Sequence, residues 1–485
     1  MKTAGNKYIS PTALTWITSL LLTYFGARLL FLALSVSTFV PPDEVTHAGI
    51  SKIYSTVQLF PVNSPETWGF GLVTNIPWLY YSVMGKLLHL NLFGIPDLLF
   101  LRMLNIPLAF GTVWYAVRLL RLLTYDRSTE LLLVTVMTNI PMFSLLSASV
   151  SYDNLANLLA AMSIYYLCAF FRERSARLLV TSLLCQMAGN LTKVTFLPLT
   201  AVLSILLLCH EVKRIKDLPR FLLQRVSKPE FRHGFTLLLL LTALGANIHL
   251  YGGNYLRYGV MNPSLETVVS PDAAMEHRLD ARGKIFTLYH DSKISYMDAL
   301  ILAGEIKHAG DKADLFYLLM NYEKLKQNPD LWLGPFGYVK SWAWFMLATI
   351  VGIKAHLQMY KGMFWMVPVY LLLSLSAVGF LARWRPLRGG WLPAALAATS
   401  LLYAGFIFFE FNYPSYQLYG EPSLTVYGRY LFPVLAPCSV LFCRYLLQLF
   451  SSATLRTAVA ITTALLFMSY DFPWFLLHAT SEWYL

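Results

Sequence analysis

Two adjacent carboxylates, Asp43 and Glu44, lie directly after the first long apolar run of the chain. That run covers about 25 residues, roughly positions 12–38, which is enough to cross a bilayer, and Pro41 and Pro42 end its helix. Carboxylates this close to hydrocarbon are costly unless a site uses them. At the membrane–water boundary they can take the proton of a hydroxyl that attacks a substrate arriving through lipid. The alternative is a water-exposed helix end whose acids cap the next helix.

Further polar residues fall on the same side of the bilayer in the topology derived below, although they are far apart in sequence. They are His47, Tyr81, Lys86, Arg102, Asp153, Asn154, Lys193, Tyr427 and Arg429. Arginine and lysine can hold a phosphate, and arginine presents a planar fork to its oxygens. With a carboxylate as base, this set suits a sugar carried on a lipid phosphate.

Each of these residues also has a plain structural interpretation. Lys86, Lys193 and Arg429 can snorkel to the membrane surface. Asp153 and Asn154 favour turns, and His47 fits an ordinary surface position. The residue types alone leave both interpretations open.

The composition predicts an all-α membrane protein. The 485 residues are 56% hydrophobic and 13% charged, with a mean hydropathy of +0.53, whereas soluble domains carry about 25% charge. The net charge of +12 lies largely in short loops between apolar runs, so it needs no nucleic-acid partner. All five cysteines lie in or beside apolar runs and no CxxC occurs, which argues against disulfides and zinc.

Apolar runs predict about eleven transmembrane helices, treated as one body over residues 1–485. They cover about 12–38, 97–120, 129–147, 154–171, 178–189, 194–209, 235–251, 364–382, 391–409, 430–447 and 457–469. Basic residues orient them, because Lys2, Lys7 and the basic segment 210–233 are expected in the cytoplasm. The two acids then face outward.

Two segments are predicted to lie in the interface rather than to cross. One is 73–92 within a first external loop, 39–96, and the other is the tryptophan-rich run 341–353 within a larger external loop, 254–362. The acids and bases of 254–340 nearly balance, and helix-like stretches occur at 295–308 and 311–327. We expect a folded loop there, because disorder needs low hydrophobicity and high net charge.

Several stretches resemble, in order, the GT-C superfamily of polyprenyl-phosphate-dependent glycosyltransferases. The first, Pro41–His47, looks like a PPDE-x-x-H opening of a bacterial branch, and Tyr427–Pro433 looks like its GRYLLPLLP segment. Between them, Asn75–Tyr81, Leu101–Asn105, Ser149–Asn157 and Leu191–Lys193 resemble the interfacial helix, the next span start, the external turn and the LTK segment.

The resemblance implies a GT-C-like bundle and an inverting transfer from a polyprenyl-phosphate sugar to an envelope glycan, lipid or protein. Asp43 or Glu44 would be the base, and Lys86, Arg102 or Arg429 would meet the phosphate. The implied location is the bacterial inner membrane, with the active site facing the periplasm. The transfer would be metal-independent or assisted by a divalent cation, and no metal ligand is assigned because no DxD triplet follows the first span. The alternatives are a lipid-linked sugar flippase or an O-antigen polymerase or ligase.

Overall fold

A computed structural model describes residues 11–212, 231–275, 277–383 and 391–485. In this described part the chain is mostly helical, and its strands form one short antiparallel hairpin, β1 (Ile353–Lys354) and β2 (Gln358–Met359). The predicted all-α membrane fold is therefore confirmed. The charge signals of Lys2, Lys7 and residues 213–230 lie outside the described residues.

Within these residues, eight continuous helical stretches are long and apolar enough to cross a membrane. They contain α1 (Pro11–Ser35), α4 (Asp97–Leu123), α7 (Tyr152–Glu173), α11 (Phe231–Asn247) with η4 (Ile248–Gly252) and α12 (Gly253–Tyr258), α19 (Met363–Ala382), α20 (Trp391–Ile407) with η6 (Phe408–Asn412) and α21 (Tyr413–Tyr419), η7 (Gly428–Val434) with α22 (Leu435–Gln448), and α23 (Ala453–Tyr470) with α24 (Phe472–His478).

The remaining predicted spans are shorter or broken. The pair α5 (Arg127–Thr138) and α6 (Pro141–Ser147) passes the same test together but bends by 67° at its break. Pro141 at the start of α6 lacks the N–H that would continue the helical ladder. Helices α8 (Ala176–Asn190) and α9 (Phe196–Glu211) have 15 and 16 residues, below the usual length of about 17–25 for a span. The total of eleven spans stays a prediction.

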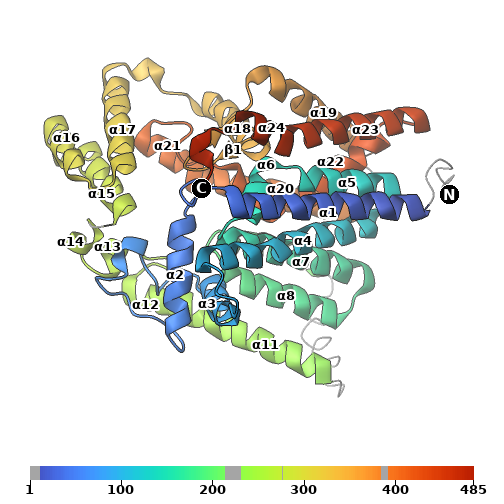
Figure 1. The fold of residues 1–485 in the computed structure, drawn as a ribbon, viewed down its shortest axis with the longest axis horizontal. Helices are drawn as coiled ribbons and strands as arrows, with labels where there is room; N and C mark the ends of the chain where they lie inside the picture. The colour runs from blue at the N-terminus through green and yellow to red at the C-terminus, as the bar shows by residue number, and fades with distance from the viewer. Residues whose placement is uncertain (1–10, 213–230, 276, 384–390) are drawn as a thin grey trace.

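Shorter helices gather at one end of the bundle, opposite the start of α1 (Figure 1). On the side of the first loop they are α2 (Glu44–Thr56), η1 (Trp68–Phe70), α3 (Leu79–Leu87) and η2 (Leu88–Leu90). In the large loop they are α13 (Leu265–Val268), α14 (Pro271–Ala274), α15 (Arg278–His290), α16 (Tyr296–Glu305), α17 (Ala309–Gln327), η5 (Pro329–Leu331) and α18 (Pro335–Val351), and η8 (Ser481–Trp483) ends the chain.

The large loop has its own apolar core, as a folded segment requires. Phe286 of α15, Ala299 of α16 and Leu318 of α17 are buried against one another, and Leu418 and Tyr419 of α21 lie over them. Helices occur at both stretches that the sequence indicated, 295–308 and 311–327. The segment predicted as a second interfacial run, 341–353, forms most of α18 and enters β1.

A buried ion pair fastens the chain's C-terminal part to the first helix. The guanidinium of Arg28 in α1 contacts the carboxylate of Asp471 and donates to Asn139 Oδ1 at 2.9 Å. Ser144 Oγ donates to the same carboxylate at 2.8 Å. Both charges are nearly inaccessible, so this pair positions α1, α5, α6 and α24 rather than meeting a ligand.

Candidate active site

The turn after α1 separates the two adjacent acids. Asp43 occupies the N-cap position of α2 with φ at 59°, in the left-handed region, and its side chain does not cap the helix. The capping alternative therefore does not apply to it. Glu44 is the first residue of α2, so its side chain leaves the helix in a different direction. The backbone conformation, rather than the acid type, decides which partners each residue reaches.

Glu44 is enclosed by protein. Its two oxygens accept from Arg102 Nε at 2.9 Å and Arg102 Nη2 at 2.5 Å, and Oε1 also accepts from the N–H of Val150 at 2.8 Å. Arg102 Nη1 donates to the carbonyls of Ala33 and Val36 at 2.8 Å each. Burial raises the pKa of Glu44, and the bonds from Arg102 and Val150 oppose that rise. All three guanidinium nitrogens of Arg102 are occupied, so this geometry does not support the prediction that Arg102 meets a phosphate.

Asp43 lies at the edge of a second, larger group of charges. Its Oδ2 accepts from Arg429 Nη2 at 3.0 Å, although the two residues are 386 positions apart. One third of the Asp43 side chain is exposed, compared with none of Glu44. Burial alone would raise the pKa of Asp43, but the charges of Arg429, His47 and His356 lower it to about 2. Asp43 is therefore an ionised, partly accessible carboxylate.

Asp153 links the two cations of this group. Its carboxylate contacts Lys193 Nζ and lies 3.9 Å from Arg429 Nη1. Asp153 is held at the start of α7, where Ser151 Oγ accepts from the Asp153 N–H at 3.2 Å. We call Asp43, Asp153, Lys193 and Arg429 the charged cluster.

Aromatic rings form the walls of the charged cluster. Lys193 Nζ lies 4.9 Å from the ring centroid of Tyr152 and 5.1 Å from that of Tyr430. The guanidinium of Arg429 lies 5.4 Å from the ring centroid of Tyr427. Arg429 is only 8% exposed, and its buried Nε has no hydrogen-bond partner among the described residues. This leaves a donor free within the cluster.

Gly428 allows the close approach that brings Arg429 into place. A Cβ there would lie 2.5 Å from Ile350 Cγ1 and 2.8 Å from the carbonyl oxygen of Met346, both in α18. The Gly428 N–H also donates to Thr349 Oγ1 at 2.7 Å. Any side chain at this position would push η7 away from α18 and Arg429 away from Asp43.

His47 and Tyr81 lie beside the charged cluster. His47 Nδ1 is 2.9 Å from Tyr81 Oη, and the His47 ring packs on Tyr152 with centroids 4.4 Å apart. Burial lowers the pKa of His47 to about 4, so the imidazole is neutral at physiological pH. The structure brings both residues to the site, although His47 is buried rather than on the surface.

Two of the predicted site residues, Asn154 and Lys86, lie outside the charged cluster. Asn154 donates to Asn105 Oδ1 at 3.0 Å and to the carbonyl of Leu146 at 2.8 Å, which fixes the turn between α6 and α7. Lys86 is exposed on α3 and donates to the carbonyl of Val57. Asn154 thus stabilises the turn that precedes Asp153. The geometry does not place Lys86 within the charged cluster.

Sequence reasoning missed Lys354 as a site residue. The hairpin carries it beneath the loop before η7, where Nζ lies 4.4 Å from the Tyr427 ring centroid and donates to Val426 O at 3.3 Å. The neighbouring His356 N–H donates to Val40 O at 3.1 Å, which ties the hairpin to the turn that holds Asp43. Burial lowers the pKa of Lys354 to about 8. Its only sequence signal was a lysine after a tryptophan-rich run.

No protein-family profile and no curated protein matches the chain. Among solved structures, the chain aligns with the crystal structure of ArnT from Cupriavidus metallidurans in the apo state. That alignment covers 90% of this chain and 78% of the other, at 11% identity and a TM-score of 0.39.

Proposed function

We propose that this protein is a membrane glycosyltransferase of GT-C type, which moves a sugar from a polyprenyl-phosphate donor to an envelope glycan, lipid or protein acceptor. The observation that carries the proposal is the pairing of a partly exposed carboxylate, Asp43, with a buried arginine, Arg429, whose Nε has no partner within the described part of the chain. A base and a phosphate-binding cation thus lie within one hydrogen bond of each other.

The proposed reaction assigns a task to each charge. Asp43 takes the proton of the acceptor hydroxyl as its oxygen attacks the anomeric carbon. The bond from that carbon to the phosphate oxygen breaks, and the polyprenyl phosphate leaves with the electron pair. Arg429 and Lys193 stabilise the charge that develops on the phosphate. Asp153 keeps the two cations in place.

We favour Asp43 over Glu44 as the base, because the Asp43 side chain is partly exposed and that of Glu44 is not. Glu44 accepts three hydrogen bonds from protein donors and its side chain is inaccessible. An acceptor hydroxyl would have to displace the Arg102 pair to reach it. We propose a structural role for Glu44.

The periplasmic face of a bacterial inner membrane remains the proposed location. It is supported by the predicted loop charges and by the place of α2, whose N-cap residue is Asp43, at the end of the bundle opposite the start of α1 (Figure 1). No metal is assigned to the mechanism, and the part of the chain that the structure describes contains no group of three potential metal ligands.

The test is sugar transfer by the purified protein in lipid vesicles, with a radiolabelled polyprenyl-phosphate sugar and a membrane extract as the acceptor. We expect Asp43→Asn to insert normally and to lose transfer by about 100- to 10,000-fold, the usual contribution of a general base. Full activity of this variant would refute the mechanism. Movement of the labelled carrier across the vesicle without transfer of sugar would instead support the flippase.

A further inference from the structure

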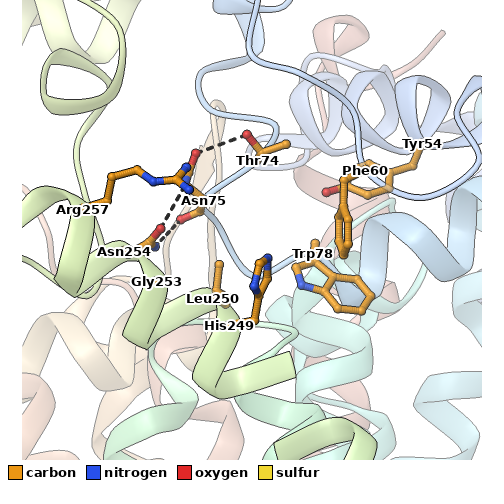
Figure 2. A pocket seen from close by; sticks show the side chains of 10 residues that line it. All are labelled: Tyr54, Phe60, Thr74, Asn75, Trp78, His249, Leu250, Gly253, Asn254 and Arg257. Atoms are coloured by element: carbon orange, nitrogen blue, oxygen red, sulfur yellow. Dashed lines mark hydrogen bonds between the residues drawn. The ribbon is translucent and has the colours of Figure 1, made fainter. Parts of the chain in front are cut away.

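A cavity with both polar and apolar lining residues lies between the first external loop and the end of the α11 span. Its volume is about 210 Å³, and Figure 2 shows the residues around it. One wall comes from α2 and the following loop and the other from η4 and α12. The lining residues are Tyr54, Phe60, Thr74, Asn75, Trp78, His249, Leu250, Gly253, Asn254 and Arg257.

The charge of this cavity favours an anion. Arg257 and His249 are both exposed, and among the described residues that line the cavity there is no Asp or Glu. In Figure 2 the Arg257 side chain reaches across toward Asn75, while His249 lies beside Trp78. An arginine fork and an imidazole N–H are donors that suit phosphate oxygens.

A fixed pair of amides holds the two walls together. Asn75 Nδ2 donates to Asn254 Oδ1 at 2.9 Å, and Asn254 Nδ2 donates to the Asn75 carbonyl at 2.9 Å. Asn75 has φ at 65°, a left-handed conformation that asparagine tolerates better than most residues. The helix opposite widens into a π-turn at η4, a feature frequent at functional sites.

Apolar surface continues from the cavity along the membrane helix. Phe60 and Trp78 meet edge to face with ring centroids 5.0 Å apart. Phe235 and Leu238 of the α11 span are each more than 50% exposed, and they lie 14 and 11 residues before His249, on the same side of the helix. A lipid chain can lie on this face while its head group enters the cavity.

An aromatic layer separates the cavity from the charged cluster. Tyr54, which lines the cavity, stacks on Tyr81 with ring centroids 6.3 Å apart, and Tyr81 in turn contacts His47. Tyr54 is fixed by donating to the carbonyl of Val73 at 3.0 Å. The cavity is therefore a neighbouring site rather than part of the charged cluster.

We propose that this cavity binds the phosphate-bearing head group of a membrane lipid. Arg257 and His249 would contact the phosphate, and the lipid chain would lie along the exposed face of α11. The inference does not depend on glycosyl transfer, since it concerns binding at residues outside the charged cluster.

The experiment is a native mass spectrometry titration of the full chain in detergent with a polyisoprenyl monophosphate. The titration is run in wild type and in Arg429→Gln, because the charged cluster is proposed to bind the same group. We expect binding to persist in Arg429→Gln and to weaken by about tenfold or more when Arg257→Gln and His249→Gln are added. The matched control is Arg456→Gln, at an exposed arginine in the first turn of α23, and it should leave the affinity for the lipid unchanged.

Two further probes identify the ligand chemistry. Polyisoprenol, which lacks the phosphate, should bind at least tenfold more weakly than the monophosphate, and inorganic phosphate should compete poorly. Equal binding of polyisoprenol would overturn the role of Arg257 and His249. Equal binding of inorganic phosphate would overturn the role of the lipid chain. Affinity unchanged from Arg429→Gln when Arg257→Gln and His249→Gln are added to it would overturn the site, whatever the transfer assay shows.

Discussion

The neighbouring carboxylates Asp43 and Glu44 differ in how far solvent can reach them and their arginine partners. Glu44 and Arg102 form a sealed pair whose hydrogen bonds are satisfied by the protein, with 0% and 2% of their side chains exposed. Asp43 and Arg429 form a pair at the edge of the protein, with 34% and 9% exposed. A sealed ion pair can position helices but cannot meet a substrate, whereas a pair with one accessible acid can do both.

Replacement of Arg429 should have a large effect on transfer, second only to Asp43→Asn, and so test the accessible pair. We expect Arg429→Gln to lower transfer by about 100- to 1,000-fold, because it removes the donor proposed to stabilise the leaving phosphate. Arg429→Lys, which keeps the charge but loses the planar fork, should retain part of the rate. The measurement is the initial rate in the vesicle assay, with Arg383→Gln as a control on an exposed arginine in the turn after α19. A normal rate in Arg429→Gln would contradict the assignment.

The sealed pair should show its effect in stability instead. Glu44→Gln leaves the buried charge of Arg102 without a partner, which costs about 3–5 kcal/mol of unfolding free energy. The thermal midpoint of the purified protein measures this loss. Replacing both residues by methionine removes both charges and should recover most of the stability. A stable Glu44→Gln protein that transfers no sugar would return Glu44 to the role of base.

The pH dependence of transfer should distinguish the contribution of Lys354 from those of Asp43 and His47, because these groups change their charge at different pH. Because Asp43 has a pKa of about 2 and His47 of about 4, neither group changes its charge between pH 5 and 7, and we expect no loss of rate from them there. Lys354 has a pKa of about 8, so it loses its positive charge as the pH rises through 8. Donor KM should then rise a few-fold, since one cation beside Tyr427 and Arg429 is lost. In Lys354→Arg, which stays charged, that alkaline rise should disappear, and its persistence would exclude Lys354.

The smallest effect is expected at Lys86. Its side chain is exposed and donates to the Val57 carbonyl, and surface contacts of this kind contribute about 0–1 kcal/mol. Lys86→Ala should therefore keep transfer within about twofold of wild type in the same vesicle assay. A much larger loss would show that the first loop moves Lys86 to the donor during the reaction.

Much of the helical arrangement could be predicted because apolar length is a local property. The runs at 97–120, 154–171 and 364–382 correspond to α4, α7 and α19, within the usual error at helix ends. The helix α2 was missed, because its sequence Glu44–Thr56 is short and only weakly apolar. The bend between α5 and α6 was missed as well, since a continuous apolar run does not show how a proline within it will turn the chain.

The candidate site was predictable as a set of residues but not as a set of contacts. Sequence placed Asp43, Asp153, Lys193 and Arg429 on one side of the membrane through the order of spans. It gave no means to pair Asp43 with Arg429 and Glu44 with Arg102, because those partners are 386 and 58 positions away.

Local sequence determined that this chain would form apolar helices, with acids and cations gathered near their ends, because helix formation and transfer into lipid depend on short stretches of residues. Only the tertiary structure decided which charges would be sealed and which would stay accessible. Burial and ion pairing depend on what the rest of the chain places nearby. A left-handed turn at Asp43 and the close packing of Gly428 on α18 settled that choice.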